Sequence, residues 1–220
     1  MNSQPQLIDS GEPFKKAGLV HRVSQPAGNG SWSTAVLLHG HAGNEDVMWI
    51  FARTLPKNWL LVAPRAIHDG GAEGGYSWYP RQLDVWPTLS EFDEAVTAVT
   101  HFIRTLPDLY NADPTRIYLM GFSQGTALAY AIAMQQPGLV QGIAGLVGFL
   151  PEQADATPLQ DLPIFMAIGT QDERIPVKYA RQGAKIIKTA DAQLDYHEYD
   201  TGHKLNAQGM RDLTAWWQAR

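Results

Sequence analysis

The sequence predicts an α/β fold in which a mostly parallel central sheet is flanked by helices on both faces. Short apolar runs alternate with longer segments of helical periodicity, which is typical of βα units. Several of these runs are apolar throughout, as expected for strands that are covered on both faces. A chain of 220 residues favours one domain over residues 1–220, in which about 70% of the unfolded surface becomes buried.

Apolar runs define the predicted strands of this sheet. They cover residues 34–38, 59–63, 116–120, 142–147, 163–168 and 194–199. Residues 20–23 are expected to add an edge strand, and residues 1–18 to form a loosely ordered N-terminal segment.

Apolar residues spaced by three or four positions predict helices over residues 89–106, 177–187 and 210–217. Thr88 and Glu91 have the spacing of a capping box at the start of the first helix. Residues 123–135 are rich in alanine, which suits a helix packed closely on a sheet. The glycine-rich residues 68–75 and the proline-containing residues 149–162 are expected to be loops at strand ends, where open α/β sheets bind ligands.

The composition excludes several classes of function. The net charge is −5 and lysine and arginine do not cluster, so no nucleic-acid partner is expected. Cysteine is absent, which excludes disulfides, thiolate metal sites, iron–sulfur clusters and a cysteine nucleophile. No apolar stretch is long enough to span a membrane, and the polar N-terminal residues lack the apolar core of a secretory signal. A cytoplasmic location is therefore expected.

The motif Gly121-Phe122-Ser123-Gln124-Gly125 connects a predicted strand to a predicted helix. In this context G-x-S-x-G forms a tight turn that exposes the serine hydroxyl at the helix N-terminus. The free amides and the dipole at that terminus favour a developing oxyanion. The alternative is a glycine-rich connection with an incidental serine. The flanking strand and the alanine-rich helix favour Ser123 as a nucleophile.

A serine nucleophile needs a base, and a carboxylate must orient that base. His203 follows the last predicted strand and is the best candidate among the histidines, because the others lack a comparable context. Asp172 follows the strand at 163–168 and gives the order Ser, Asp, His, which is the order of hydrolases with this fold. Asp200 is the rival carboxylate because it lies close to His203 in sequence. His197 falls within a strand and is expected to pack.

An oxyanion hole needs two amide donors. The main-chain amide of Gln124 directly follows the nucleophile, and a second donor is assigned to the main chain of His41 in the loop after residues 34–38. His39 and His41 could instead suggest a metal site, but two histidines without further ligands are weak evidence. No metal site is predicted, and His39 is expected to brace the loop by hydrogen bonds.

These motifs resemble those of the α/β-hydrolase superfamily and, more narrowly, of the phospholipase/carboxylesterase family that includes the acyl-protein thioesterases. The matching pieces are Leu38-His39-Gly40, Tyr76-Ser77-Trp78-Tyr79, residues 116–125, Gly169-Thr170-Gln171-Asp172, Ile175-Pro176 and Gly202-His203.

The resemblance implies a cofactor-free serine hydrolase that acts on small carboxylic esters or thioesters. Esters of short acids, lysophospholipids and acylated proteins all stay open as its substrates. It implies Ser123, Asp172 and His203 as the catalytic triad, and the amides of His41 and Gln124 as the oxyanion hole. It also places Trp78 beside the substrate, although a core aromatic side chain is the alternative for Trp78.

The chain departs from the family pattern after His39-Gly40. The family often has an apolar residue and a glycine there, whereas this chain has His41 and Ala42. A main-chain donor survives this change, but a preference for long acyl chains becomes an open question. The apolar start of the 149–162 loop, Phe149 and Leu150, is expected to border the acyl site.

Two other functions stay open at this stage. One is a ligand-binding protein of the same fold that does not hydrolyse its ligand, although candidates for every member of the triad are present. The other is a lyase or perhydrolase on the same fold. A homodimer is also left open, because Trp216 and Trp217 are adjacent and cannot face the same way on a helix, but packing against a neighbouring helix is the favoured interpretation.

Overall fold

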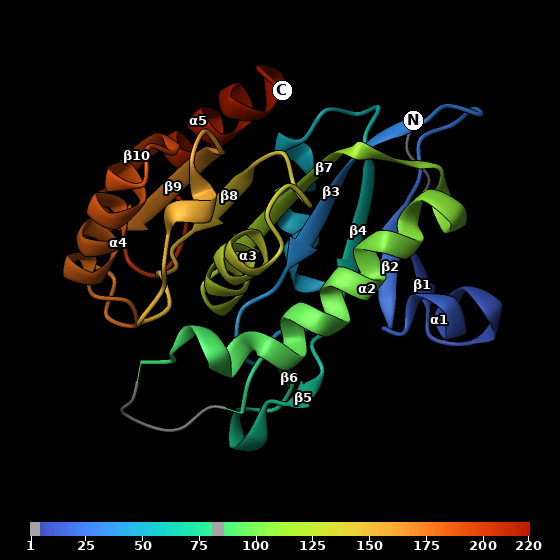
Figure 1. Ribbon diagram of the computed structural model, residues 1–220, viewed down its shortest axis with the longest axis horizontal. Coiled ribbons are helices and arrows are strands. Elements are labelled where there is room, and N and C mark those ends of the chain that lie inside the picture. Colours follow the sequence, from blue (N-terminus) through green and yellow to red (C-terminus); the bar gives the residue numbers. More distant parts are fainter. Residues whose placement is uncertain (1–4, 81–85) are drawn as a thin grey trace.

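The computed structural model describes residues 5–80 and 86–220, within which eight strands form one central sheet (Figure 1). The strand order is β1-β2-β4-β3-β7-β8-β9-β10. The pairs from β4 to β10 are parallel, whereas β1–β2 and β2–β4 are antiparallel. The strands are β1 (Gln6–Ile8), β2 (His21–Ser24), β3 (Trp32–Leu38), β4 (Leu60–Pro64), β7 (Ala112–Phe122), β8 (Ile143–Leu146), β9 (Pro163–Gly169) and β10 (Gln193–Tyr199). A separate antiparallel ribbon pairs β5 (His68–Asp69) with β6 (Tyr76–Ser77).

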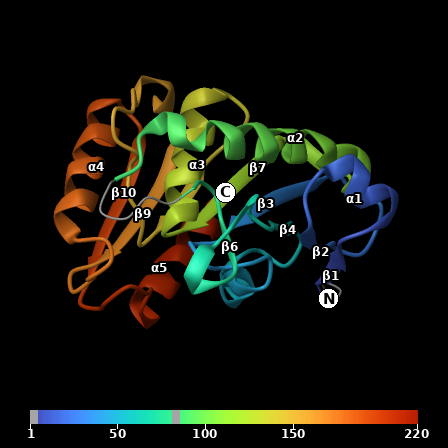
Figure 2. The same ribbon diagram turned by 90° about the horizontal axis from the view of Figure 1, so that it is seen from below.

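Helices cover both faces of the sheet, which confirms the predicted fold class (Figure 2). One face carries α1 (Gly11–Ala17), α2 (Asp93–Tyr110), α3 (Gln124–Gln135) and α4 (Val177–Thr189). The other face carries α5 (Ala207–Gln218) and the 3₁₀ helix η1 (Val47–Thr54). Each face has its own buried apolar cluster, so β3, β7, β8 and β9 are apolar along most of their length.

The predicted strands are all present, with differences at their ends. The strand predicted at 20–23 is β2. It is not the edge of the sheet, because β1 pairs with it, with Gln6 opposite Val23 and Ile8 opposite His21. The prediction of a loosely ordered segment over 1–18 is wrong for the described part, which holds β1 and α1. A three-residue strand has no periodic signal of its own, and pairing with β2 is what stabilises it.

The predicted helices are present as well. The helix predicted at 89–106 is a short 3₁₀ turn, η3 (Leu89–Phe92), that continues into α2, and the capping box of Thr88 and Glu91 is present. The loop at 68–75 contains β5 and the 3₁₀ helix η2 (Gly71–Glu73). The loop at 149–162 contains η4 (Thr157–Leu159).

Both tryptophans of the last helix, α5, pack into the protein core. Trp217 is fully buried and its ring lies 5.6 Å from the ring of Trp59, while Trp216 is 6% exposed. The exposure that would favour a homodimer through this tryptophan pair is therefore absent. Across residues 5–80 and 86–220, no helix has the length and apolar content to cross a membrane.

Candidate active site

Ser123 lies in a strained turn at the carboxyl end of β7. Its φ is 53° and its ψ is −114°, and its amide donates to the carbonyl of Leu146 on β8 over 2.8 Å. The flanking glycines are required by space: a Cβ at Gly121 would lie 2.3 Å from the Gly125 carbonyl oxygen, and one at Gly125 would lie 2.1 Å from the Leu38 carbonyl oxygen. A non-glycine residue holds such a conformation only where its surroundings fix it, and such positions cluster at functional sites.

His203 and Asp172 meet at the same edge of the sheet. The Nδ1–H of His203 donates to Oδ2 of Asp172 over 2.7 Å, and the Asp172 side chain is fully buried. The second carboxylate oxygen, Oδ1, accepts from the amides of Arg174 and Ile175, each over 2.9 Å. These bonds fix the carboxylate, and the carboxylate fixes the imidazole ring. The rival Asp200 is exposed and accepts from the Gln171 side chain instead.

Loop packing brings His203 beside the Ser123 turn. The amide of Gln171 donates to the Thr201 carbonyl over 3.0 Å, which joins the loop after β9 to the loop after β10. The ring of Phe122 contacts the His203 ring edge to face, with centroids 5.3 Å apart. Because Phe122 directly precedes Ser123, this contact places the His203 ring next to the Ser123 turn. His197 instead packs on Phe165 within the sheet, as predicted.

The loop after β3 lies against Ser123. A Cβ placed on Gly40 would be 3.3 Å from the Cβ of Ser123. His39 is buried and uses both ring nitrogens: Nε2 accepts from the Ala66 amide over 3.0 Å, and Nδ1–H donates to the Gly40 carbonyl over 2.7 Å. Burial lowers the pKa of His39 to about 4, so its ring is neutral at ordinary pH. His39 therefore braces the loop, as predicted.

His41 points toward η2, where its Nε2 lies 3.7 Å from a carboxylate oxygen of Glu73. The next residue, Ala42, has a φ of 59°, a conformation that favours glycine. Among residues 5–80 and 86–220, no cluster of histidines and carboxylates could hold a metal ion. The two histidines of this loop have separate partners.

Gln124 braces the site through its side chain, a role that the sequence analysis missed. Its Oε1 accepts from the Trp78 amide and its Nε2 donates to Ser77 Oγ, each over 2.9 Å. Trp78 is fully buried, and its Nε1–H donates to the His39 carbonyl over 2.7 Å. This placement fits the alternative of a core aromatic for Trp78. The sequence did carry one signal for this role, which is a long amide side chain in the first turn of a helix that is otherwise buried.

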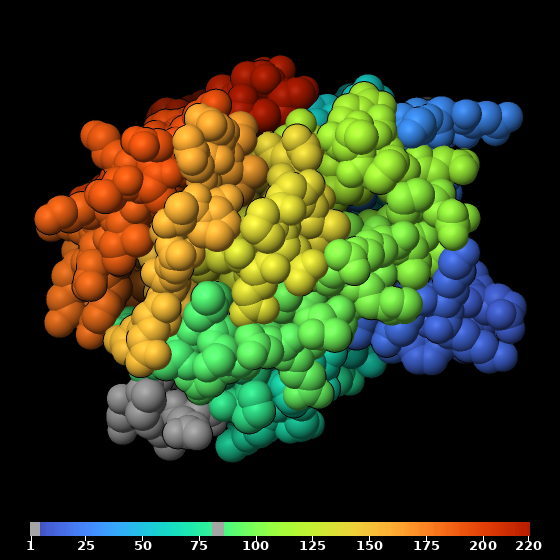
Figure 3. All heavy atoms as spheres, in the orientation of Figure 1, coloured from blue at the N-terminus to red at the C-terminus, as the bar shows by residue number. Residues whose placement is uncertain are grey.

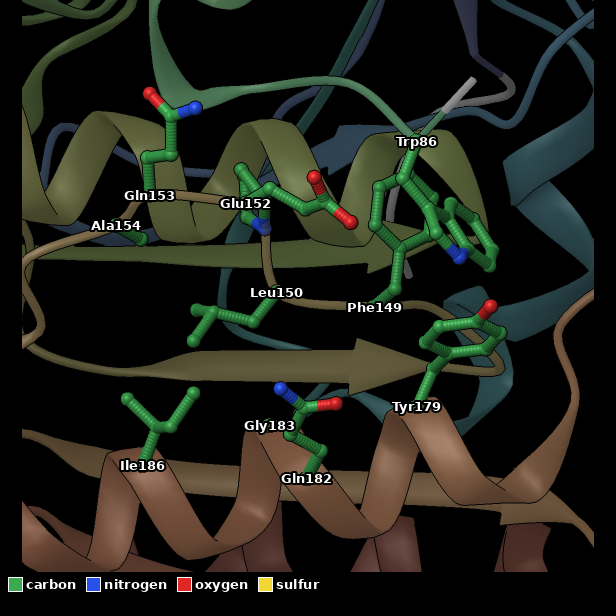
Figure 4. A pocket seen from close by; sticks show the side chains of 11 residues that line it. Trp86, Phe149, Leu150, Glu152, Gln153, Ala154, Tyr179, Gln182, Gly183 and Ile186 are labelled. Carbon is green, nitrogen blue, oxygen red and sulfur yellow. The ribbon is translucent and has the colours of Figure 1, made fainter. Parts of the chain in front are cut away.

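Phe149 and Leu150 line a pocket of about 420 Å³ between their loop and α4 (Figure 4). The ring of Trp86 lies 4.6 Å from those of Phe149 and Tyr179, measured between centroids. The other lining residues are Pro151, Glu152, Gln153, Ala154, Gln182, Gly183 and Ile186. The loop that forms this pocket runs over the molecular surface beside α4 (Figure 3).

The model of the phospholipase/carboxylesterase family matches residues 22–219. The chain belongs to this family. It is 30% identical to acyl-protein thioesterase 1 of Yarrowia lipolytica over 216 residues, which cover 88% of this chain and 94% of that protein. It is 27% identical to NocK of Nocardia uniformis, named as an esterase, over 64% of this chain but only 40% of NocK.

A solved carboxylesterase from Mesorhizobium loti shares the fold. Its TM-score is 0.84, and the match covers 99% of this chain and 100% of that one at 19% identity. Family membership makes this chain a carboxylic ester hydrolase.

Proposed function

We propose that this protein is a serine hydrolase that cleaves carboxylic esters through an acyl-enzyme, with Ser123 as nucleophile, His203 as base and Asp172 as the carboxylate that orients it. The observation that carries the proposal is the 2.7 Å hydrogen bond from His203 Nδ1–H to the buried Asp172 carboxylate. It lies beside the strained turn at Ser123, whose preceding residue contacts the His203 ring.

The proposed reaction transfers an acyl group in two halves. Because the Nδ1–H group of His203 donates a hydrogen bond to Asp172, the Nε2 atom is the basic nitrogen, and it takes the Ser123 proton as Oγ attacks the ester carbonyl. The main-chain amides of His41 and Gln124, with the N-terminus of α3, stabilise the tetrahedral oxyanion. His203 then protonates the leaving alcohol or thiol, and water attacks the acyl-enzyme by the same steps.

The pocket formed by Phe149 and Leu150 is proposed to take the acyl group. Phe149 follows shortly after Leu146, whose carbonyl accepts a hydrogen bond from the Ser123 amide, and this link between the pocket loop and the Ser123 turn supports the assignment. Leu150→Trp should fill part of the pocket and lower the kcat/KM ratio of octanoyl to acetyl esters by about tenfold. An unchanged ratio would reject this acyl site.

The substrate is proposed to be a small ester or thioester in the cytoplasm. The relative named as an acyl-protein thioesterase supports the thioester option. Oxygen esters and thioesters with the same acyl chain, assayed side by side, separate these two substrate classes. Fractionation of cells that produce the protein checks its location.

A fluorophosphonate probe and p-nitrophenyl esters test the mechanism. The wild type should be labelled once and should hydrolyse the esters, and Ser123→Ala should lose both properties. Ser90→Ala, which changes an exposed serine of η3, is the matched control and should keep both. A wild type that is neither labelled nor active would favour the ligand-binding alternative. Labelling without ester hydrolysis would favour a lyase or perhydrolase.

A further inference from the structure

Glu45 and Arg65 form a two-bond ion pair behind the loop that follows β3. The Nε and Nη2 groups of Arg65 donate to the two carboxylate oxygens of Glu45 over 2.7 Å and 2.6 Å. The Glu45 side chain is 4% exposed, and its bonds to Arg65 hold the pKa of Glu45 below the usual range. The third guanidinium nitrogen donates to the Tyr76 hydroxyl over 3.1 Å.

The loop from His39 to Glu45 contains a main-chain conformation that is unfavourable for its own sequence. Ala42 has a positive φ, which costs an alanine more than a glycine, so contacts outside the loop must fix it. Two hydrogen bonds reach the loop from outside, one to its main chain and one to the His39 side chain. The Tyr76 amide donates to the Gly43 carbonyl over 2.9 Å, and the Ala66 amide, next to Arg65, donates to His39.

The ion pair connects the two segments that donate these hydrogen bonds to the loop. Arg65 is next to Ala66, and it also binds Tyr76, so its fork ties Glu45 to both segments that hold the loop. A buried ion pair is weak evidence for stability, because the cost of removing both charges from water offsets much of their attraction. Its two parallel hydrogen bonds do fix geometry, which a pair of apolar side chains would not do.

We propose that Glu45 and Arg65 are positioning residues that hold the loop after β3 so that the His41 amide points at the substrate oxyanion. This inference rests on the proposed function, because it requires an oxyanion at Ser123. An error of about 1 Å in the position of a catalytic group can cost about 100-fold in rate. The loop is therefore held by a rigid, charged fork in addition to main-chain hydrogen bonds.

A second ion pair of the same geometry provides the matched control. Arg181 on α4 donates through Nε and Nη2 to Glu198 on β10 over 2.8 Å and 2.7 Å, and the Tyr196 hydroxyl donates to the same carboxylate over 2.8 Å. This pair contacts neither the loop after β3 nor the Ser123 turn. Its arginine is more exposed, with 60% of the side chain accessible against 28% for Arg65.

The experiment compares Glu45→Gln with Glu198→Gln, using kcat and KM for p-nitrophenyl acetate and the melting temperature of each variant. Glu45→Gln keeps the side-chain shape and removes the charge. We expect kcat to fall by about 10- to 100-fold with KM nearly unchanged, because the misplaced amide matters in the transition state. Glu198→Gln should keep both constants within about twofold, as surface pairs contribute little. Arg65→Lys keeps the charge but loses the fork, and should lie between wild type and Glu45→Gln in kcat.

Two outcomes overturn the inference: a folded Glu45→Gln enzyme with the kcat of the wild type, or an equal loss of kcat in Glu198→Gln. If Glu45→Gln does not fold, Arg65→Lys decides, and a wild-type kcat in that variant also overturns the inference. Activity that survives Ser123→Ala overturns the proposed function, whereas loss in Ser123→Ala with normal Glu45→Gln activity overturns only the positioning role.

Discussion

His39 follows β3 and His203 follows β10 at the carboxyl edge of the same sheet, yet their surroundings give them opposite properties. His39 is buried, and both of its ring nitrogens bind main-chain groups, of Gly40 and Ala66. His203 is partly exposed and hydrogen bonds through Nδ1 to the Asp172 carboxylate. The first ring is fixed as a neutral brace. The second has a carboxylate that can stabilise a positive charge as it forms.

The partners of a histidine therefore indicate its role better than its place in the sequence does. Main-chain partners on both nitrogens leave His39 no atom with which to accept a substrate proton. An ionised partner on one nitrogen prepares His203 for proton transfer at the other. Substitutions at the two positions should therefore separate activity from stability.

His203→Gln should have the largest effect. Without the base, kcat for p-nitrophenyl acetate should fall by at least about 10⁴-fold. The melting temperature should change little, because the ring is at the surface of the site. Steady-state kinetics and thermal unfolding of the same preparation test this, and a kcat within tenfold of wild type would remove His203 from the mechanism.

Asp172→Asn should lower kcat by about 10⁴-fold, because the amide would favour the wrong tautomer of His203. The Oδ1 atom of the asparagine can still accept from the amides of Arg174 and Ile175, so the fold should persist. Asp200→Asn is the matched control and should stay close to wild type in kcat. The reverse order of effects would identify Asp200 as the functional carboxylate.

His39→Phe should act on stability first. Phenylalanine fills a similar volume but leaves the Ala66 amide without its acceptor, which should cost about 1–3 kcal/mol of unfolding free energy. Denaturant unfolding measures this loss. The fall in kcat should be far smaller than in His203→Gln, and an equally inactive His39→Phe enzyme would contradict the assigned roles.

Acid should destabilise the protein through His39. The folded-state pKa of His39 is about 4 against an unfolded value of about 6.5, so the unfolded chain binds more protons between these values. The stabilisation is present above pH 6.5 and is lost as the pH falls, amounting to about 2 kcal/mol between pH 7 and pH 5. Burial lowers the pKa of His21 as well, which acts in the same direction.

Unfolding in denaturant at pH 7 and pH 5 measures this dependence. His39→Phe should lose most of it, since the titrating group is gone. The same pH dependence in the wild type and in His39→Phe would show that other groups are responsible.

Tertiary contacts decided several features that the sequence left open. Parallel pairing sets Tyr199 of β10 opposite Gly169 of β9, and this register joins the two following loops so that Asp172, not Asp200, faces His203. Trp78 lies in the core because the side chain of Gln124 and the carbonyl of His39 bind it from distant segments. Nothing within the sequence near Trp78 distinguishes this placement from one beside a substrate.

The Glu45–Arg65 pair was missed for a related reason. The two residues follow neighbouring parallel strands, β3 and β4, whose carboxyl ends meet at one edge of the sheet. Opposite charges just beyond two such strand ends were a usable signal. Their contact, however, depends on the course of both loops, which no local pattern specifies.

The sequence by itself determined the alternation of strands and helices, the turn at Ser123 and the order of the three proposed catalytic residues. These features are local, because hydrophobic periodicity and the steric demands of Gly121 and Gly125 act within a few residues. Only the tertiary structure decided which carboxylate meets His203, which aromatic side chains line a pocket and how the loop after β3 is held. Those outcomes depend on strand register and loop packing between segments that are distant in the chain.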